Sequence, residues 1–348
     1  MQNKGPKISL YLKRLVSFFL ITAFSSVSYA EKILWPISGS TFSPETKIEN
    51  YIFPNIMGNI EAGTFGYTKN NQTQLNKGID IKSTKLGKRK ESLDEIISVL
   101  PGRVVHINKT SENSYYGRYV VIQHSRYEPA IFTLYAHLKN PSLNIKLGSQ
   151  VKAGTLIGIM GRSAGGYIIS KDRVHLHFEM GLMLNENFPS WYDKQEFDYS
   201  NKQGKWNMMN LVTFDPLQFY AEANENQYMT FNSFFKCLTP ALTINVYKNK
   251  LPNFIVRYPV LSTQPLDQCR NIQGWTINFT EYGFPFNWTP FYADNNSNGV
   301  IEDDIVIVNY LPESFTRKGS YKILKVNKDN SSAELGSELI RILDILFY

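Results

Sequence analysis

Two histidines separated by one residue are the side chains of this chain best placed to do chemistry: His175 and His177, in the run Val-His-Leu-His-Phe-Glu. Residues i and i+2 of a β-strand lie on the same face, so both imidazole rings can point at one atom. Neutral imidazole is a good zinc ligand, and a second imidazole beside the metal can handle protons near neutral pH. The pair alone is a weak signal, because strands without a metal also contain such pairs by chance.

Two further residues strengthen this interpretation. His137 lies upstream in Tyr-Ala-His-Leu, and Asp80 lies in Lys-Gly-Ile-Asp-Ile. A buried structural role is the competing interpretation for His137, and a turn-capping role is the competing one for Asp80. The remaining histidines, His106 and His124, lie in or at the end of expected strands, where a structural role is favoured.

The elements that must position these side chains read as short strands separated by glycine-containing turns, from Ile33 to about Tyr220. This pattern predicts a mainly β fold with a compact antiparallel core. Three stretches interrupt the pattern as insertions: residues 82–95, 164–172 and 185–209. The last of them is rich in aromatic residues, and it either lines the rim of a groove or forms an ordered surface loop without function.

The length of 348 residues and the change in texture near residue 220 predict two domains. The first would span residues 31–220, and a polar stretch at 221–227 would be a linker. Residues 228–348 would form a smaller β-rich domain of unknown role.

Within the second domain, runs of β-branched and aromatic residues predict strands at 242–247, 254–260, 275–279 and 305–310. The chain should end in an amphipathic helix. Ser331 and Glu334 have the spacing of a capping box, and leucines at 335, 339, 343 and 346 repeat along one face.

Residues 1–30 have the pattern of a secretory signal peptide. Four basic residues precede an apolar stretch from Leu15 to Phe24, and Ser28-Tyr29-Ala30 supplies small residues for a cleavage site. The apolar stretch is shorter than the about 20 residues that cross a bilayer, so cleavage is favoured over an uncleaved anchor. We therefore expect a periplasmic or secreted protein whose mature chain has no membrane span.

Net charge and cysteine content bear on two further properties of the protein, nucleic-acid binding and disulfide formation. The formal net charge of +7 includes four positive charges of the signal peptide, which leaves 7 − 4 = +3 for the mature chain and does not suggest nucleic-acid binding. The two cysteines, Cys237 and Cys269, predict a disulfide in an exported protein, with two free buried thiols as the alternative.

An acidic stretch from Asp294 to Asp303 has the oxygen spacing and the glycine of a calcium loop. Ile305 occupies the twelfth position and cannot supply the bidentate carboxylate that such a loop needs. A plain Asn-Gly turn between strands is therefore favoured over calcium binding.

Five stretches together resemble the lysostaphin/LytM-type zinc endopeptidases, which cut peptidoglycan peptides. In the order of that family they are Phe-Gly-Tyr at 65–67, Lys-Gly-Ile-Asp-Ile at 77–81, Tyr-Ala-His-Leu at 135–138, Val-Lys-Ala-Gly-Thr-Leu-Ile-Gly at 151–158 and Val-His-Leu-His-Phe-Glu at 174–179. The resemblance covers roughly residues 33–220. It implies an antiparallel β core with an open groove over one Zn²⁺ ion, and peptidoglycan or its peptide stems as the substrate.

The resemblance also implies roles for particular residues. Asp80 and His177 match two of the three zinc ligands of the family, whereas Asn76 stands where the family has its first ligand, a histidine. His175 matches the general base, and His137 matches the group that hydrogen-bonds the developing oxyanion. An amide oxygen is a neutral and harder donor than imidazole, so we expect Asn76 to weaken zinc binding.

Two hypotheses of function follow. The first is an exported zinc endopeptidase that acts on peptidoglycan cross-links, because the metal-binding aspartate and three histidines are in place. The second is a catalytically impaired module of the same fold, which binds peptidoglycan or regulates another cell-wall hydrolase, because Asn76 replaces a ligand. Metal content would discriminate between them.

Overall fold

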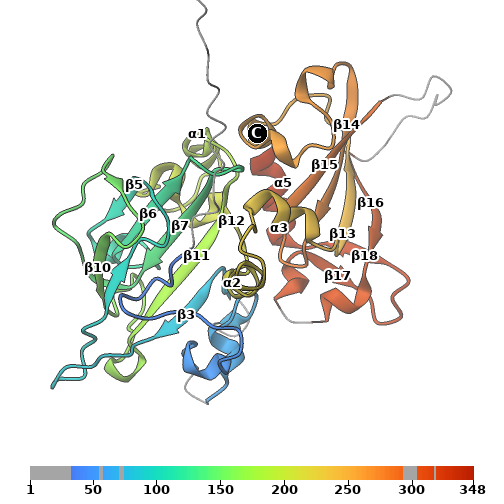
Figure 1. Ribbon diagram of the computed structural model, residues 1–348. Helices are drawn as coiled ribbons and strands as arrows, with labels where there is room; N and C mark the ends of the chain where they lie inside the picture. The colour runs from blue at the N-terminus through green and yellow to red at the C-terminus, as the bar shows by residue number, and fades with distance from the viewer. Residues whose placement is uncertain (1–32, 55–57, 70–73, 293–303, 317–318) are drawn as a thin grey trace, which may run out of the picture.

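A computed structural model describes residues 33–54, 58–69, 74–292, 304–316 and 319–348 (Figure 1). The expected signal peptide at 1–30 and the acidic stretch at 294–303 lie outside these residues. The fold is mainly β, as expected, with antiparallel pairing throughout the named strands. Among the described residues, no helix is long and apolar enough to cross a membrane.

One antiparallel sheet forms the body of the N-terminal part and has the order β12-β11-β7-β6-β5-β9, with β3 also paired to β11. Its strands are β3 (Ile79–Lys82), β5 (Gly102–Asn108), β6 (Tyr119–His124), β7 (Ile131–Ala136), β9 (Gln150–Val151), β11 (His175–Met183) and β12 (Leu211–Phe214). Both faces of β11 are buried along its whole length. Such a strand is held rigidly, and it is the strand that carries the two histidines.

Smaller elements flank this sheet. A short hairpin pairs β1 (Thr68–Lys69) with β2 (Gln74–Leu75), and a three-stranded sheet has the order β4 (Glu95–Ile97), β10 (Leu156–Met160) and β8 (Leu138–Pro141). The chain turns sharply from β7 into β8 at His137, whose φ of +59° is unusual for a residue with a side chain.

The C-terminal part is built on a second sheet of order β15-β14-β13-β16. Its strands are β13 (Leu242–Val246), β14 (Ile272–Phe279), β15 (Pro285–Tyr292) and β16 (Ile305–Tyr310), and a separate hairpin joins β17 (Leu324–Val326) and β18 (Ala333–Leu335). Three of the expected strands are therefore present. The fourth prediction, a strand at 254–260, is wrong, because these residues form helix α4 (Asn253–Arg257) and a short 3₁₀ turn.

The other helices are α1 (Phe188–Asp193), α2 (Pro216–Glu225), α3 (Phe231–Cys237) and α5 (Ser337–Leu346). Asp215 caps the N-terminus of helix α2, because its side chain accepts a hydrogen bond from the Leu217 amide. The helix contains most of the stretch expected to be a linker. The C-terminal helix is confirmed, but it begins at Ser337. The expected capping residue Glu334 lies instead in β18.

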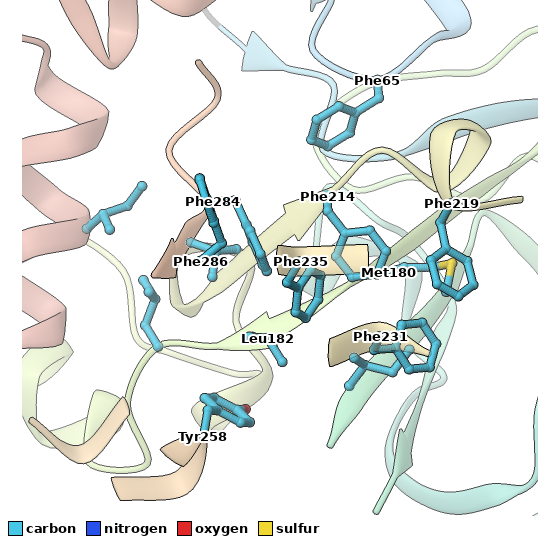
Figure 2. Close-up of a cluster of buried hydrophobic side chains, with 14 of the residues drawn as sticks. Phe65, Met180, Leu182, Phe214, Phe219, Phe231, Phe235, Tyr258, Phe284 and Phe286 are labelled. Atoms are coloured by element: carbon cyan, nitrogen blue, oxygen red, sulfur yellow. The ribbon is translucent and has the colours of Figure 1, made fainter. Parts of the chain in front are cut away.

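The two parts share one hydrophobic core. Phe214 of β12, Phe235 of α3 and Phe284 beside β15 meet with ring centroids 4.9–5.7 Å apart, and Phe219 of α2 stacks on Phe231 of α3. Figure 2 shows this aromatic cluster between elements from both parts of the chain. In Figure 1, helices α2 and α3 lie between the two sheets. The boundary at residues 221–227 remains a prediction. The hydrophobic core is continuous between the two parts.

The expected Cys237–Cys269 bond is not formed in the described structure, where both thiols are free. Cys237 lies exposed at the end of α3, whereas Cys269 is buried after a 3₁₀ turn, with its Sγ 3.5 Å from the Pro265 carbonyl oxygen. The prediction came from the even cysteine count alone, which carries no information on whether the two side chains meet.

Candidate functional site

Three neighbouring strands bring the predicted site residues together. In the pairing of β11 with β3, His177 lies opposite Asp80, and in the pairing of β11 with β7 it lies opposite Ala136. His137 directly follows β7 and therefore reaches the same end of the sheet. The ring centroid of His137 is 5.0 Å from that of His175 and 5.9 Å from that of His177. The four residues form one cluster, which we call the histidine site.

His177 is held between two carboxylates. Its Nδ1 lies 2.9 Å from Oδ1 of Asp80, and its Nε2 lies 2.9 Å from Oε1 of Glu179. Burial disfavours the charged ring, but the hydrogen bonds with Asp80 and Glu179 outweigh it and raise the pKa of His177. Tyr116 completes the arrangement: its hydroxyl donates to Oε1 of Glu179 at 2.6 Å, and its ring stacks on His177.

His175 has its tautomer fixed by the backbone. Its Nδ1 lies 2.7 Å from the Arg173 carbonyl oxygen, which can only accept, so the proton of the neutral ring is on Nδ1. The lone pair of the neutral ring is then on Nε2, which lies 3.9 Å from Oδ2 of Asp80. Phe53 stacks against this ring, with centroids 5.8 Å apart.

His137 is fixed in the same way. Its Nδ1 donates to the Ser163 carbonyl oxygen at 2.8 Å, and its Nε2 lies 3.5 Å from the hydroxyl of Tyr167. Burial, followed by the proximity of His175 and His177, lowers the pKa of His137 well below its ordinary value. The ring is therefore neutral at pH 7, and its Nε2 is a proton acceptor.

Asn76 lies buried in the loop between β2 and β3. Its Nδ2 donates to the Thr64 carbonyl oxygen at 3.0 Å, and its backbone pairs with Gly66 and Tyr67. Its Oδ1 is buried and has no hydrogen-bond partner among the described residues. A buried oxygen without a partner is costly, so it is a position where a cation would be favourable.

Asp80, His177 and Asn76 have the donor types that a metal ion accepts, although they make an incomplete set. Asp80 and His177 are adjacent and Asn76 has an unpaired oxygen, which together give one imidazole and two oxygen donors. Within the described ranges, however, no three His, Cys, Asp or Glu side chains are grouped as a metal site. A metal at this position would therefore need the amide oxygen of Asn76 as its third protein ligand.

Several residues that support the site were not predicted to have roles. Glu179 could have been found, because it is two residues after His177 and thus on the same strand face. The carbonyl groups of Arg173 and Ser163 could not, since backbone acceptors carry no residue signature. Tyr116 could not either, because its contacts with Glu179 and His177 join residues far apart in the sequence. Tyr167 lies in the predicted insertion at 164–172. Its ring contact with His137 depends on the folded chain and has no signal in the sequence.

His106 and His124 lie outside the site, as expected for structural histidines. Burial lowers the pKa of each ring to about 4. His124 donates from Nδ1 to the Pro101 carbonyl oxygen at 2.9 Å and has Thr133 Oγ1 2.8 Å from Nε2, and His106 packs on Tyr119.

The region that contains this site is similar to known proteins. Among solved structures, the chain is similar to a variant of the catalytic domain of the prophage-encoded M23 protein EnpA from Enterococcus faecalis, with 24% identity over 34% of this chain and 77% of that chain and a TM-score of 0.25. It is also similar to the catalytic domain of the antimicrobial peptidase lysostaphin from Staphylococcus simulans, with 20% identity over 45% and 88% of the two chains and a TM-score of 0.27.

A third similar structure is a putative glycyl-glycine endopeptidase LytM from Ruminococcus gnavus, with 20% identity over 42% of this chain and 47% of that chain and a TM-score of 0.27. No curated protein matches the chain. The family model of peptidase family M23 matches residues 74–187, a range that includes Asn76, Asp80, His137, His175 and His177. Residues 74–187 therefore form a domain of peptidase family M23.

Proposed function

We propose that this protein is an exported, metal-dependent endopeptidase that acts on the peptide part of peptidoglycan, with a weakened zinc centre. The observation that carries the proposal is the paired orientation of two histidines. The Nδ1 atoms of His137 and His175 are both held by backbone carbonyls, so both neutral rings carry their lone pairs on Nε2 beside the Asp80–His177 pair. Family membership supports peptidase chemistry, and the predicted signal peptide supports a periplasmic or secreted location.

Asp80, His177 and the amide oxygen of Asn76 would hold the zinc ion. Bound zinc supplies Lewis acidity toward the scissile carbonyl and toward water. Glu179 orients the His177 ring through Nε2, as carboxylates beside metal-bound histidines commonly do.

His175 and His137 would move the protons. The Nε2 of His175 accepts a proton from the attacking water and can return it to the leaving amine. A hydrogen bond from His137 to an oxyanion needs a proton on Nε2, and the neutral ring, with its proton on Nδ1, lacks one. His137 would therefore be an alternative proton acceptor to His175, and only a His137 ring that has taken the water's proton in place of His175 could donate to the oxyanion.

The experiment that tests this function restores the missing ligand. Asn76→His should raise zinc affinity by at least about tenfold, because it replaces a neutral amide with the imidazole that zinc prefers. Cleavage of cross-linked peptidoglycan should rise with it, and adding His177→Ala should abolish both gains. Asn140→His, at an exposed position of β8, controls for zinc captured by any added surface histidine. If zinc affinity rises and no cross-linked peptide is cut, the enzyme proposal fails.

A second candidate, a non-catalytic module that binds peptidoglycan or regulates another cell-wall hydrolase, is favoured by one observation. Asp80 and His177 already satisfy each other at 2.9 Å, and the amide of Asn76 is anchored to Thr64. In such a module the wild-type protein binds peptidoglycan sacculi with the same affinity in the presence of zinc and of a chelator. The endopeptidase instead requires metal for turnover.

A further inference from the structure

A hollow of about 360 Å³ opens beside the histidine site and has no role in the function proposed above. Three cationic side chains line it, Arg118, Lys139 and Arg162, together with two carboxylates, Glu91 and Glu112. Ser163 and Tyr167 also line it. Because Ser163 and Tyr167 both contact His137, the hollow and the histidine site are adjacent.

A crossing of three backbone segments fixes the hollow and His137 together. The Arg118 amide donates to Oγ of Ser163, that hydroxyl donates to the Leu138 carbonyl, and the Leu138 amide donates to the Arg118 carbonyl, all at 2.8–3.0 Å. A side chain at Gly117 would collide with the Ser163 carbonyl, with a Cβ only 2.2 Å from its oxygen. The backbone at Arg118, and the residues adjacent to Lys139 and Arg162, are therefore held by the same contacts that set the His137 ring.

The cations outnumber their partners. The Arg118 guanidinium donates to the carbonyls of Lys109 and Lys139, and it forms no ion pair among the described residues. The ammonium of Lys139 is exposed. It has no hydrogen bond or ion pair among the described residues. Arg162 donates to the Ile169 carbonyl and lies 3.8 Å from Glu91, which neutralises it in part. Arg118 and Lys139 thus have no ion-pair partner among the described residues, and the lining carries one more cation than carboxylates.

From this arrangement we propose that the hollow binds a free carboxylate of the peptide substrate. The proposal rests on the peptide substrate of the proposed function and names a chemical feature of it. Tyr167 lines the hollow and also reaches Nε2 of His137. An extended peptide held at the histidines would therefore pass the hollow, because both contain residues that contact His137. Glu112, the other carboxylate on the wall, selects against a second acidic group there.

The test compares two probes on the full mature protein. One is a synthetic peptidoglycan stem tetrapeptide with free α-carboxylates, and the other is the same peptide with every carboxyl group amidated. The acidic peptide should bind at least about threefold more tightly at low salt, which is the range expected for solvent-accessible ion pairs. This preference should weaken at high ionic strength because salt screens exposed charges.

Variants locate the effect. Lys139→Gln should lower the preference for the acidic peptide, Lys139→Glu should remove or reverse it, and Lys139→Gln with Arg162→Gln should abolish it. Lys139 has no side-chain partner to lose, so its variants should fold. Lys146→Gln, which changes an exposed lysine away from the hollow, should leave the preference unchanged.

Equal binding of the two peptides, absence of binding by either, or a preference that survives Lys139→Glu would each overturn the proposal. The measurement needs neither zinc nor turnover. A preference that persists without any cleavage therefore upholds the carboxylate site while the endopeptidase proposal fails.

Discussion

Two buried histidines on the strands next to β7, His124 of β6 and His177 of β11, lie opposite its two ends in different electrostatic surroundings. At its beginning, His124 contacts a carbonyl group and a hydroxyl group, and burial lowers its pKa to about 4. At its other end, His177 lies between two carboxylates, and its pKa is raised. Both rings are almost inaccessible to water. The comparison shows that the charge of its partners, and not burial alone, sets the direction in which the pKa of a buried histidine moves.

Buried polar atoms without a hydrogen-bond partner are a second difference between the surroundings of His177 and those of His124. Oε2 of Glu179, beside His177, and Oδ1 of Asn76, four residues before Asp80, are buried without a hydrogen-bond partner among the described residues. Both ring nitrogens of His124 have a partner. Since unsatisfied buried groups cost about 1–3 kcal/mol each, the site is held at a cost that only a bound group would offset.

The largest expected effect concerns acid stability at the His124 end. The folded pKa of about 4 lies below the unfolded value of 6.5, so the unfolded chain binds the proton first as pH falls. The stabilisation from neutral His124 is present above pH 6.5 and is lost between pH 6.5 and 4, about 3 kcal/mol in all at 1.36 kcal/mol per pKa unit. Urea unfolding at a series of pH values should show a shallower dependence in this window for His124→Gln than for wild type. Identical slopes would contradict the assignment.

An intermediate effect is expected at the other end, from the carboxylate that orients His177. Glu179→Gln keeps the shape of the side chain but removes its charge. It should lower zinc affinity about ten- to hundredfold, the usual effect of losing a group that orients a metal ligand. Competition with a fluorescent zinc chelator measures the change. Asp94→Asn, a buried carboxylate held by Ser83 and Thr84 away from the histidines, is the matched control and should leave zinc affinity unaltered.

The smallest expected effect concerns the hydroxyl of Tyr167. Its contact with Nε2 of His137 is long, at 3.5 Å, and the ring is partly exposed. Tyr167→Phe should therefore change the free energy of unfolding by less than about 0.5 kcal/mol, as is usual for surface positions. In the Asn76→His background it should reduce cleavage less than His137→Gln does. A loss as large as that of His137→Gln would give the hydroxyl a direct part in the reaction.

The grouping of His137, His175, His177 and Asp80 follows in part from the sequence, because His175 and His177 lie two residues apart in one strand. That Asp80 lies opposite His177 is seen only in the pairing of β11 with β3. The tautomers of His137 and His175 could not be predicted, since they depend on carbonyl groups that any residue could supply.

The errors have a common physical origin. Residues 254–260 are β-branched and aromatic, as in a strand, but Phe254 and Tyr258 pack on one face at helical spacing, with ring centroids 4.9 Å apart. Ser331 and Glu334 have a capping-box spacing, yet the chain there pairs Glu334 with Lys325 in a hairpin. In both segments tertiary contacts override local preference, which is a weak determinant over so few residues.

The contact between the loop before β3 and helix α5 has a consequence for how this chain could have evolved. Lys77, one residue after Asn76, donates to the carbonyls of Met208 and Leu211 and pairs with Glu338 of α5 at 3.2 Å. Arg341 of the same helix pairs with Glu338 and donates to the Met209 carbonyl. Removing residues 228–348 would take away the carboxylate partner of the buried Lys77 ammonium and leave it only two carbonyl acceptors. A different C-terminal part would therefore have to supply an acidic partner for Lys77, which couples the sequence of α5 to that of the loop before β3.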